Sequence, residues 1–177
     1  MKRKTIGVIV VVGVVLSVLA GLAVAAQDKY TVKVPGGLAF SEFRGYEAWQ
    51  VVAISQSGST MAAIVANPAM IKAYKAGVPL NGQAFPEGSR IVKLQWKPKK
   101  STEAPFVVDV PDVFKQAFVM EKDSKRFPET GGWGYAVFNY DATSDKFTAD
   151  PAPANCGNTC HVAVKAKDYI FHPYQKR

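Results

Sequence analysis

The stretch Cys156-Gly157-Asn158-Thr159-Cys160-His161 holds both cysteines of the chain and one of its two histidines, and it decides how the rest of the sequence is interpreted. Two thiols followed at once by an imidazole suit covalent c-type haem, because each thiol bonds to a haem vinyl group and the histidine ligates the iron. Three residues separate the cysteines instead of the usual two. Residues i and i+4 of a helical turn share one face, and Gly157 gives the backbone room to bulge. We therefore expect haem c on Cys156 and Cys160, with His161 as the iron ligand.

The same residues allow two other interpretations. In an exported chain two cysteines commonly oxidise to each other, and a Cys156–Cys160 disulfide would give a secreted domain without haem. A zinc site would use both thiolates and His161, but it needs a fourth ligand. His172 is the only other imidazole in the chain, so zinc is the poorer alternative.

The N-terminal residues predict export. Three positive charges in residues 1–4 precede an almost wholly apolar run over residues 5–26. This pattern is typical of a secretory signal peptide over residues 1–26, cleaved after Ala25 or Ala26. The run exceeds the ~7–15 residues of a typical signal core and approaches the ~20 of a spanning helix, so an uncleaved membrane anchor through residues 5–26 is the alternative. Either way we expect a periplasmic domain, which is where bacteria attach c-type haem.

Charge and length indicate one compact domain that does not bind nucleic acid. The formal net charge is +8, but the lysines are scattered and no nucleic-acid motif accompanies them. A positive charge could steer acidic partners towards the protein. About 150 residues remain after the signal, which is an ordinary single-domain length. We expect an N-terminal arm over residues 27–45 and a single haem domain over residues 46–177.

Hydrophobic periodicity predicts an α+β fold, mainly an antiparallel β-sheet with a few helices. A helix of about ten residues is expected after the N-cap Asn67 and Pro68, ending at Gly77. The Lys/Pro-rich residues 97–111 and the polar residues 141–153 are expected to be loops. Five segments are predicted as strands from apolar runs or from alternation of apolar and polar residues, and the first two form a hairpin around the turn signal Gln56-Ser57-Gly58-Ser59: 46–55, 60–66, 89–97, 114–122 and 135–140.

An ordered set of motifs resembles the cytochrome P-460 family. The matching segments are Phe85-Pro86-Glu87-Gly88-Ser89-Arg90-Ile91-Val92-Lys93, Lys122-Asp123-Ser124-Lys125-Arg126-Phe127, Gly132-Trp133-Gly134-Tyr135-Ala136-Val137-Phe138 and the late Cys…Cys-His. The resemblance extends from about Tyr46 to His161. It implies a β-rich c-type cytochrome, commonly a homodimer, whose five-coordinate haem has an open face for small ligands.

Two positions distinguish the types within that family. Members that oxidise hydroxylamine carry a lysine bonded to the haem edge, and the resemblance places Lys93 at that position, five residues after Gly88. The alternative is a strand lysine whose ammonium reaches water. The same members have a distal carboxylate that accepts a proton, where this chain has Phe118. An aromatic wall keeps the iron face dry and favours uncharged diatomics such as nitric oxide or carbon monoxide, the ligands of the c-prime-beta members. Strand alternation points the nearby Glu121 away from Phe118.

These observations predict a periplasmic c-type cytochrome that binds or converts hydroxylamine or nitric oxide, with a redox partner cytochrome. It would be an oxidoreductase if Lys93 is bonded to the haem. The alternative is a low-spin electron carrier, in which Met120 or His172 is a second iron ligand. We expect Met120 to fill the core and His172 to be a surface or packing residue.

Overall fold

The computed structural model describes residues 26–152 and 155–175. The predicted signal peptide or anchor, residues 1–26, therefore lies outside the described residues except for Ala26. Within the described ranges, no helix has the length and apolar character needed to cross a membrane.

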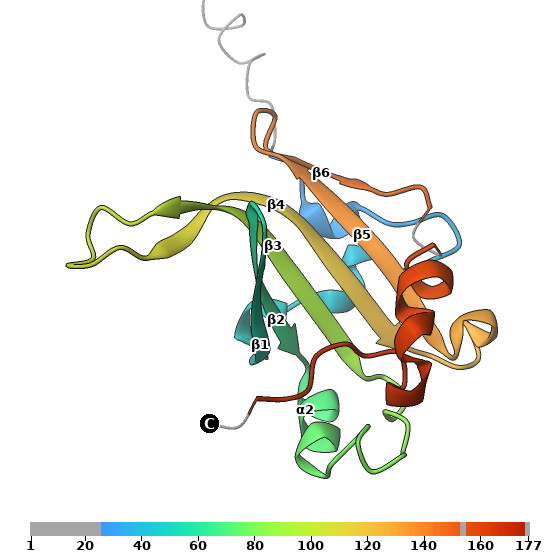
Figure 1. The fold of residues 1–177 in the computed structure, drawn as a ribbon. Coiled ribbons are helices and arrows are strands. Elements are labelled where there is room, and N and C mark those ends of the chain that lie inside the picture. Colours follow the sequence, from blue (N-terminus) through green and yellow to red (C-terminus); the bar gives the residue numbers. More distant parts are fainter. Residues whose placement is uncertain (1–25, 153–154, 176–177) are drawn as a thin grey trace, which may run out of the picture.

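A six-stranded antiparallel sheet forms the centre of the molecule, with its strands in sequential order (Figure 1). This confirms the predicted α+β, mainly antiparallel fold. The predicted hairpin turn joins the first two strands through residues 58–59, where Ser57 pairs with Thr60 and Gly58 has a positive φ of 52°. The strands are β1 (Gln50–Ser57), β2 (Thr60–Ala66), β3 (Arg90–Lys100), β4 (Asp109–Lys122), β5 (Trp133–Asp141) and β6 (Lys146–Ala149).

The helices are short. The α-helix α2 (Pro68–Lys75) begins as predicted, because the Asn67 side chain accepts a hydrogen bond from the Met70 N–H at 3.1 Å. It is followed by Gly77, whose φ of +95° suits glycine. The other helical segments are the 3-10 helices η2 (Lys29–Thr31), η3 (Phe40–Phe43), η4 (Tyr46–Ala48), η5 (Pro128–Thr130) and η7 (His161–Lys167), and the π-helical turn η6 (Cys156–Cys160).

One face of the sheet is covered by the N-terminal segment. Leu38, Phe40 and Phe43 are fully buried there. The ring of Phe40 stacks on that of Phe138 from β5, with 4.6 Å between the ring centroids. Residues 27–45, predicted as an arm leading into the domain, thus contribute side chains to its core.

The opposite face carries the C-terminal segment and a second core cluster. Strand alternation directs Ile64, Ile91, Met120 and Tyr135 to this face, and all four are buried. In Figure 1 the C-terminal chain, drawn in red, crosses in front of the strands while the N-terminal segment lies behind them. The sheet is therefore buried on both sides, and the C-terminal layer holds the cysteines and both histidines.

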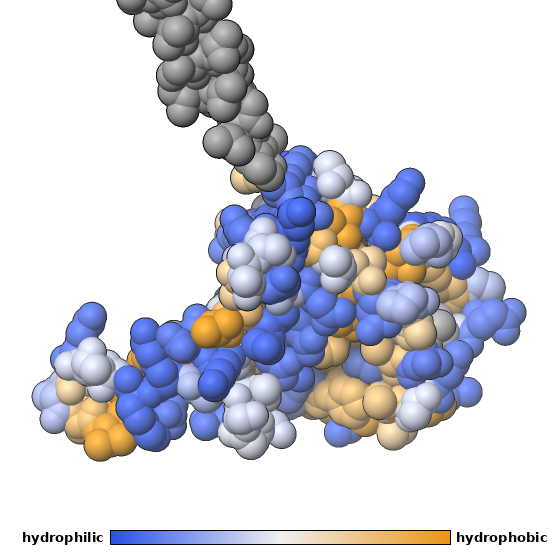
Figure 2. Space-filling model, turned by 90° about the horizontal axis from the view of Figure 1, so that it is seen from above, coloured by the Kyte–Doolittle hydropathy of each residue, from blue (hydrophilic) through white to orange (hydrophobic). Residues whose placement is uncertain are grey.

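Two predicted loops differ in the structure. Residues 97–100 and 109–111 belong to strands, because β3 and β4 continue as a projecting hairpin in which Lys100 pairs with Asp109. Its tip exposes Phe106 and Val107, and Figure 2 shows the projection extending away from the body. Within residues 141–153, β6 pairs with β5 and extends the sheet. Neither face of these segments is deeply buried, so their sequences are rich in lysine, proline and polar residues. They therefore lack the apolar pattern from which a strand is predicted.

Candidate functional site

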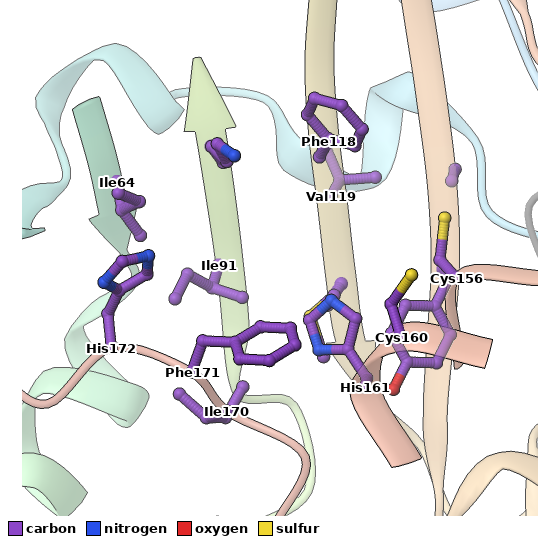
Figure 3. A pocket seen from close by; sticks show the side chains of 14 residues that line it. Ile64, Ile91, Phe118, Val119, Cys156, Cys160, His161, Ile170, Phe171 and His172 are labelled. Atoms are coloured by element: carbon purple, nitrogen blue, oxygen red, sulfur yellow. The ribbon is translucent and has the colours of Figure 1, made fainter. Parts of the chain in front are cut away.

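A cavity of about 300 Å³ lies between the sheet and the C-terminal segment (Figure 3). Its lining is mostly apolar, with contributions from β2, β3, β4, β5 and the segment after residue 155. All five site residues expected from the sequence line this cavity: Lys93, Phe118, Cys156, Cys160 and His161. Residues up to 68 positions apart are thus brought to one place by the sheet and the layer on it.

The two cysteines lie at either end of the π-helical turn η6. The backbone N–H of His161 donates to the Cys156 and Gly157 carbonyls, which closes the wide turn. Such a turn accommodates one more residue than an α-helical turn would, which is how the three-residue spacing still brings both thiols to the cavity. The two sulfurs are not bonded to each other. Burial raises the pKa of the Cys156 thiol, and the nearby Cys160 raises it further, so Cys156 remains a thiol at neutral pH.

Gly157 is required by close packing. It is buried beneath the turn, and a Cβ there would lie 2.6 Å from Cε2 of Tyr135 and 3.1 Å from Cγ2 of Thr130. The glycine thus lets the turn approach β5, while the π-helical geometry takes up the extra residue between the cysteines.

The imidazole of His161 is held in one tautomer. Its Nδ1 lies 2.6 Å from the Tyr169 carbonyl oxygen, so Nδ1–H donates and the lone pair of Nε2 is left for a metal. Burial lowers the pKa of His161, and the Lys93 ammonium lowers it further against the opposing effect of the Tyr169 bond. Both effects keep the ring neutral, which is the form that binds iron.

The Tyr169 carbonyl that binds His161 belongs to a turn, and a buried ion pair between Asp168 and Lys122 holds this turn in place. Asp168 and Tyr169 both have positive φ, 47° and 63°, and they reverse the chain after η7. The Asp168 carboxylate accepts from Lys122 Nζ at 2.7 Å and from the Phe85 N–H at 2.8 Å. Sequence reasoning found Lys122 only as part of a family motif. It missed Asp168 and Tyr169, since no local pattern pairs residues so far apart in the chain.

Lys93 and Phe118 are direct cross-strand neighbours on β3 and β4. The Lys93 Nζ lies 5.3 Å from the centroid of the Phe118 ring, and no hydrogen bond or ion pair joins that ammonium to the described parts of the chain. Glu121 does not line the cavity, as strand alternation predicts, and its carboxylate pairs with Arg90 at 2.6 Å. Of the described residues, none that lines the cavity is an aspartate or glutamate.

His172 also lines the cavity, where the sequence predicted a surface or packing residue. Its backbone is fixed, because the Tyr74 hydroxyl donates to its carbonyl at 3.0 Å. Met120 is buried in the core, as expected, and also borders the cavity. The sequence of the aromatic tail does not predict that His172 lines the cavity. Its position depends on how the C-terminal segment packs across α2 and β1.

The residues present fit a haem better than a bare ion. The described ranges hold no cluster of three or more histidine, cysteine or acidic side chains able to bind a metal ion. Two unjoined thiols and an oriented imidazole instead face an apolar cavity. The Tyr135 hydroxyl is buried beside it and finds no hydrogen-bond partner within the described chain. An apolar space with a few convergent polar groups is the usual form of a cofactor site.

The antiparallel sheet, the two thiols and the oriented imidazole place this protein in the class of haem-binding proteins. The family model of cytochrome P-460 matches residues 43–172, and the chain belongs to the cytochrome P-460 family. No curated protein matches the sequence at a significant level. Family membership makes the protein a cytochrome with haem iron as its cofactor. It confirms the resemblance read from the motifs, and the match continues past His161 through the tail to His172.

Proposed function

We propose that this protein is a periplasmic c-type cytochrome that binds a small nitrogenous ligand, hydroxylamine or nitric oxide, at an open haem face. One observation carries the proposal. Cys156, Cys160 and His161 converge on one apolar cavity, with the Nδ1 of His161 occupied by a carbonyl and its Nε2 left for iron. A hydrogen bond of this kind, made by the other ring nitrogen, is the usual support of a metal-binding histidine.

The residues divide the work of holding the cofactor. Each cysteine would form one thioether, in which sulfur bonds to a vinyl carbon and the thiol hydrogen goes to the other vinyl carbon. His161 would supply the axial ligand. When bound, haem iron supplies a redox-active metal with an open coordination position. Phe118 and Ile64 keep the cavity apolar, and the absence of a carboxylate from its described lining favours uncharged ligands.

Lys93 decides between binding and oxidation in this proposal. Its ammonium is directed at the cavity beside Phe118 and has no carboxylate partner among the described residues. We propose it as the lysine that bonds to the haem edge, which would favour hydroxylamine oxidation over gas binding. The new N–C bond would replace one N–H bond of Lys93 and one C–H bond of the haem edge, and the two protons and two electrons released would pass to an external oxidant of the peroxide class. Proteolysis of the loaded protein would then release a haem peptide still tethered to the segment containing Lys93. Lys93→Leu would lose both the tether and hydroxylamine turnover, whereas Lys97→Leu, an exposed lysine on the same strand, would keep them.

Haem attachment is the first test. The protein would be produced in a periplasm with haem-attachment machinery, and its mass and pyridine haemochrome spectrum measured. We expect the mass of one covalent haem and a two-thioether spectrum. Cys156→Ala and Cys160→Ala would each shift the spectrum to that of a single thioether. A colourless protein with a Cys156–Cys160 disulfide would contradict the proposal.

The open iron position is the second test. A five-coordinate ferrous spectrum that shifts on addition of carbon monoxide supports ligand binding. A six-coordinate spectrum that does not shift would instead indicate an electron carrier with Met120 or His172 as second ligand, since both residues border the cavity.

Export and partners complete the proposal. The apolar N-terminal residues and the c-type attachment chemistry both favour the periplasm, with membrane anchoring through residues 5–26 as the alternative. A redox partner cytochrome would take up electrons if hydroxylamine is oxidised. The size of the purified protein by light scattering tests the homodimer implied by the family resemblance.

A further inference from the structure

His172 occupies the end of the cavity away from the cysteines. Figure 3 shows its ring beside Ile64 of β2, whereas Cys156 and Cys160 lie on the side of β5. The strand register joins Ile64 to Lys93 and Lys93 to Phe118 in one cross-strand row. The imidazole of His172 therefore faces the same wall as Phe118, which is the wall proposed to border the open iron position.

The two histidines of the chain differ in their hydrogen bonding. His161 has its Nδ1 held by the Tyr169 carbonyl at 2.6 Å. The ring of His172 makes no hydrogen bond to any described part of the chain, although its backbone is anchored through Tyr74. Metal-binding histidines almost always have the second ring nitrogen held by a carbonyl, a carboxylate or water. An imidazole on a fixed backbone with both nitrogens free suits exchange of protons with a ligand better than permanent ligation.

The charges around His172 favour its neutral form. Burial lowers the pKa of His172, and the Lys93 ammonium on β3 lowers it further. The Tyr74 hydroxyl on α2 donates a hydrogen bond to the His172 carbonyl, and the other titratable residues that line the same cavity are Tyr135, His161, Cys156 and Cys160. No carboxylate of the described lining competes for a proton.

We propose that His172 is the proton-exchanging residue of this cavity and takes the place of the carboxylate that Phe118 replaces. The inference rests on the proposed function, because it requires a small ligand bound in the cavity. In the forward step an N–H or O–H bond of the ligand breaks, its proton moves to a ring nitrogen of neutral His172, and the bonding electron pair stays on the ligand. When protonated, His172 donates a hydrogen bond to the ligand.

Carbon monoxide is the probe, because it has no proton of its own and its stretching band reports the local field. Infrared spectra of the loaded, reduced protein would be recorded from about pH 8 to about pH 5, the range in which histidine changes its charge. We expect the C–O band to move to lower wavenumber as His172 becomes protonated. In His172→Gln and His172→Leu the band would not change with pH. Gln175→Leu, an exposed tail residue outside the cavity lining, would behave as the wild type.

Hydroxylamine binding gives an independent readout. The affinity of the oxidised protein for hydroxylamine, measured by absorbance at neutral pH, should fall about fivefold in His172→Leu, the effect of losing one hydrogen bond. Equal affinities in the wild type and His172→Leu would overturn the inference.

The outcomes separate this inference from the proposed function. Loss of covalent haem or of carbon monoxide binding in the wild type would refute the proposed function. A haem-loaded protein whose carbon monoxide band is independent of pH would refute only the role of His172. A six-coordinate ferrous spectrum that becomes five-coordinate in His172→Leu would make His172 an iron ligand, and would also overturn the inference.

Discussion

A backbone oxygen, not a side chain, determines the chemistry of His161. The Tyr169 carbonyl accepts the Nδ1 proton at 2.6 Å, and burial disfavours the imidazolium. Together they leave a neutral ring with Nε2 available. Burial and the Lys93 charge also favour the neutral form of His172, but its ring makes no hydrogen bond to the described chain. Two identical side chains in one cavity are thus prepared for different roles.

The Gly157 position tests how tightly the cysteine turn must pack. In Gly157→Ala the new methyl group would lie 2.6 Å from the Tyr135 ring, so either the turn or the ring must shift. We expect a loss of about 1–3 kcal/mol in the free energy of unfolding, the usual cost of overpacking a core. We also expect a lower yield of two-thioether protein. Denaturant unfolding and the haemochrome spectrum measure the two effects.

The adjacent Asn158→Ala is the matched control, because Asn158 is exposed on the same turn. It should leave stability within about 0.5 kcal/mol of the wild type. Equal stability and haem content in Gly157→Ala and Asn158→Ala would show that the turn does not depend on this contact.

The two histidines also predict how stability of the haem-free protein depends on pH. Burial and Lys93 lower the pKa of both rings in the folded state, whereas both titrate near ~6.5 when the chain is unfolded. The unfolded state therefore binds protons at a higher pH than the folded state. The free energy of unfolding should fall as pH decreases through about 6.5, and this contribution ends below the folded pKa values.

Urea unfolding of the haem-free protein at about pH 8 and about pH 5 measures this dependence. His172→Gln removes one of the two groups and should reduce the difference between the two pH values. A wild type and a variant with the same pH dependence would contradict the lowered pKa of His172.

At the scale of elements, the turn after η7 depends on a buried ion pair. Asp168→Asn keeps the shape of the side chain, and asparagine tolerates the positive φ of 47°. It nevertheless leaves the Lys122 ammonium buried without its charged partner, beside the Gly131 carbonyl and the Trp133 ring. We expect a loss of about 3 kcal/mol in unfolding free energy, as for other broken buried pairs. The haem of the variant should also show altered iron ligation, because the Tyr169 carbonyl would lose its support.

The exposed pair of Lys100 and Asp109 provides the control. Its N···O distance of 2.8 Å is close to the 2.7 Å of the Lys122–Asp168 pair, but its lysine is 66% exposed. Asp109→Asn should cost no more than about 1 kcal/mol. Thermal unfolding of Asp168→Asn and Asp109→Asn compares the two losses of stability. Equal losses would show that burial does not set the strength of the Lys122–Asp168 pair.

Elements with a local signal could be predicted from the sequence. The β1–β2 hairpin follows from the turn signal around Gly58 between two apolar runs, and α2 from the cap at Asn67. The extension of β3 and β4 and the whole of β6 could not be predicted in this way. Their residues are largely exposed, so only pairing with a neighbouring strand makes them strands.

At the scale of the whole molecule, the site also has residues that the sequence predicts and residues that it does not. Cys156, Cys160, His161, Lys93 and Phe118 could be found because a motif or a family position marks each of them. The Tyr169 carbonyl and His172 reach the cavity only because the tail folds over the second face of the sheet. The Tyr74 hydroxyl and the Val52 carbonyl hold that tail through hydrogen bonds to its backbone, which have no sequence signature.

The projecting hairpin is the part of the molecule least connected to its body. The hydrogen bonds of its tip are local: the Ser101 N–H donates to the Val108 carbonyl, and the Ser101 hydroxyl accepts from the backbone N–H groups of Glu103 and Ala104. Phe106 and Val107 are 69% and 81% exposed, so they bury little apolar area within one chain. The tip should therefore contribute little to the folding of the body.

Replacing residues 101–108 by Asn-Gly tests this expectation. Lys100 and Asp109 pair directly, and a two-residue Asn-Gly turn is the favoured connection between such strand ends. We expect the shortened protein to retain its haem, with an unfolding free energy equal to that of the wild type or up to about 1 kcal/mol higher, because a shorter loop costs less entropy to close. Differential scanning calorimetry and the haemochrome spectrum are the measurements. A loss of more than about 1 kcal/mol would mean that the tip stabilises the fold through contacts made in solution, since a surface change without such contacts has little effect.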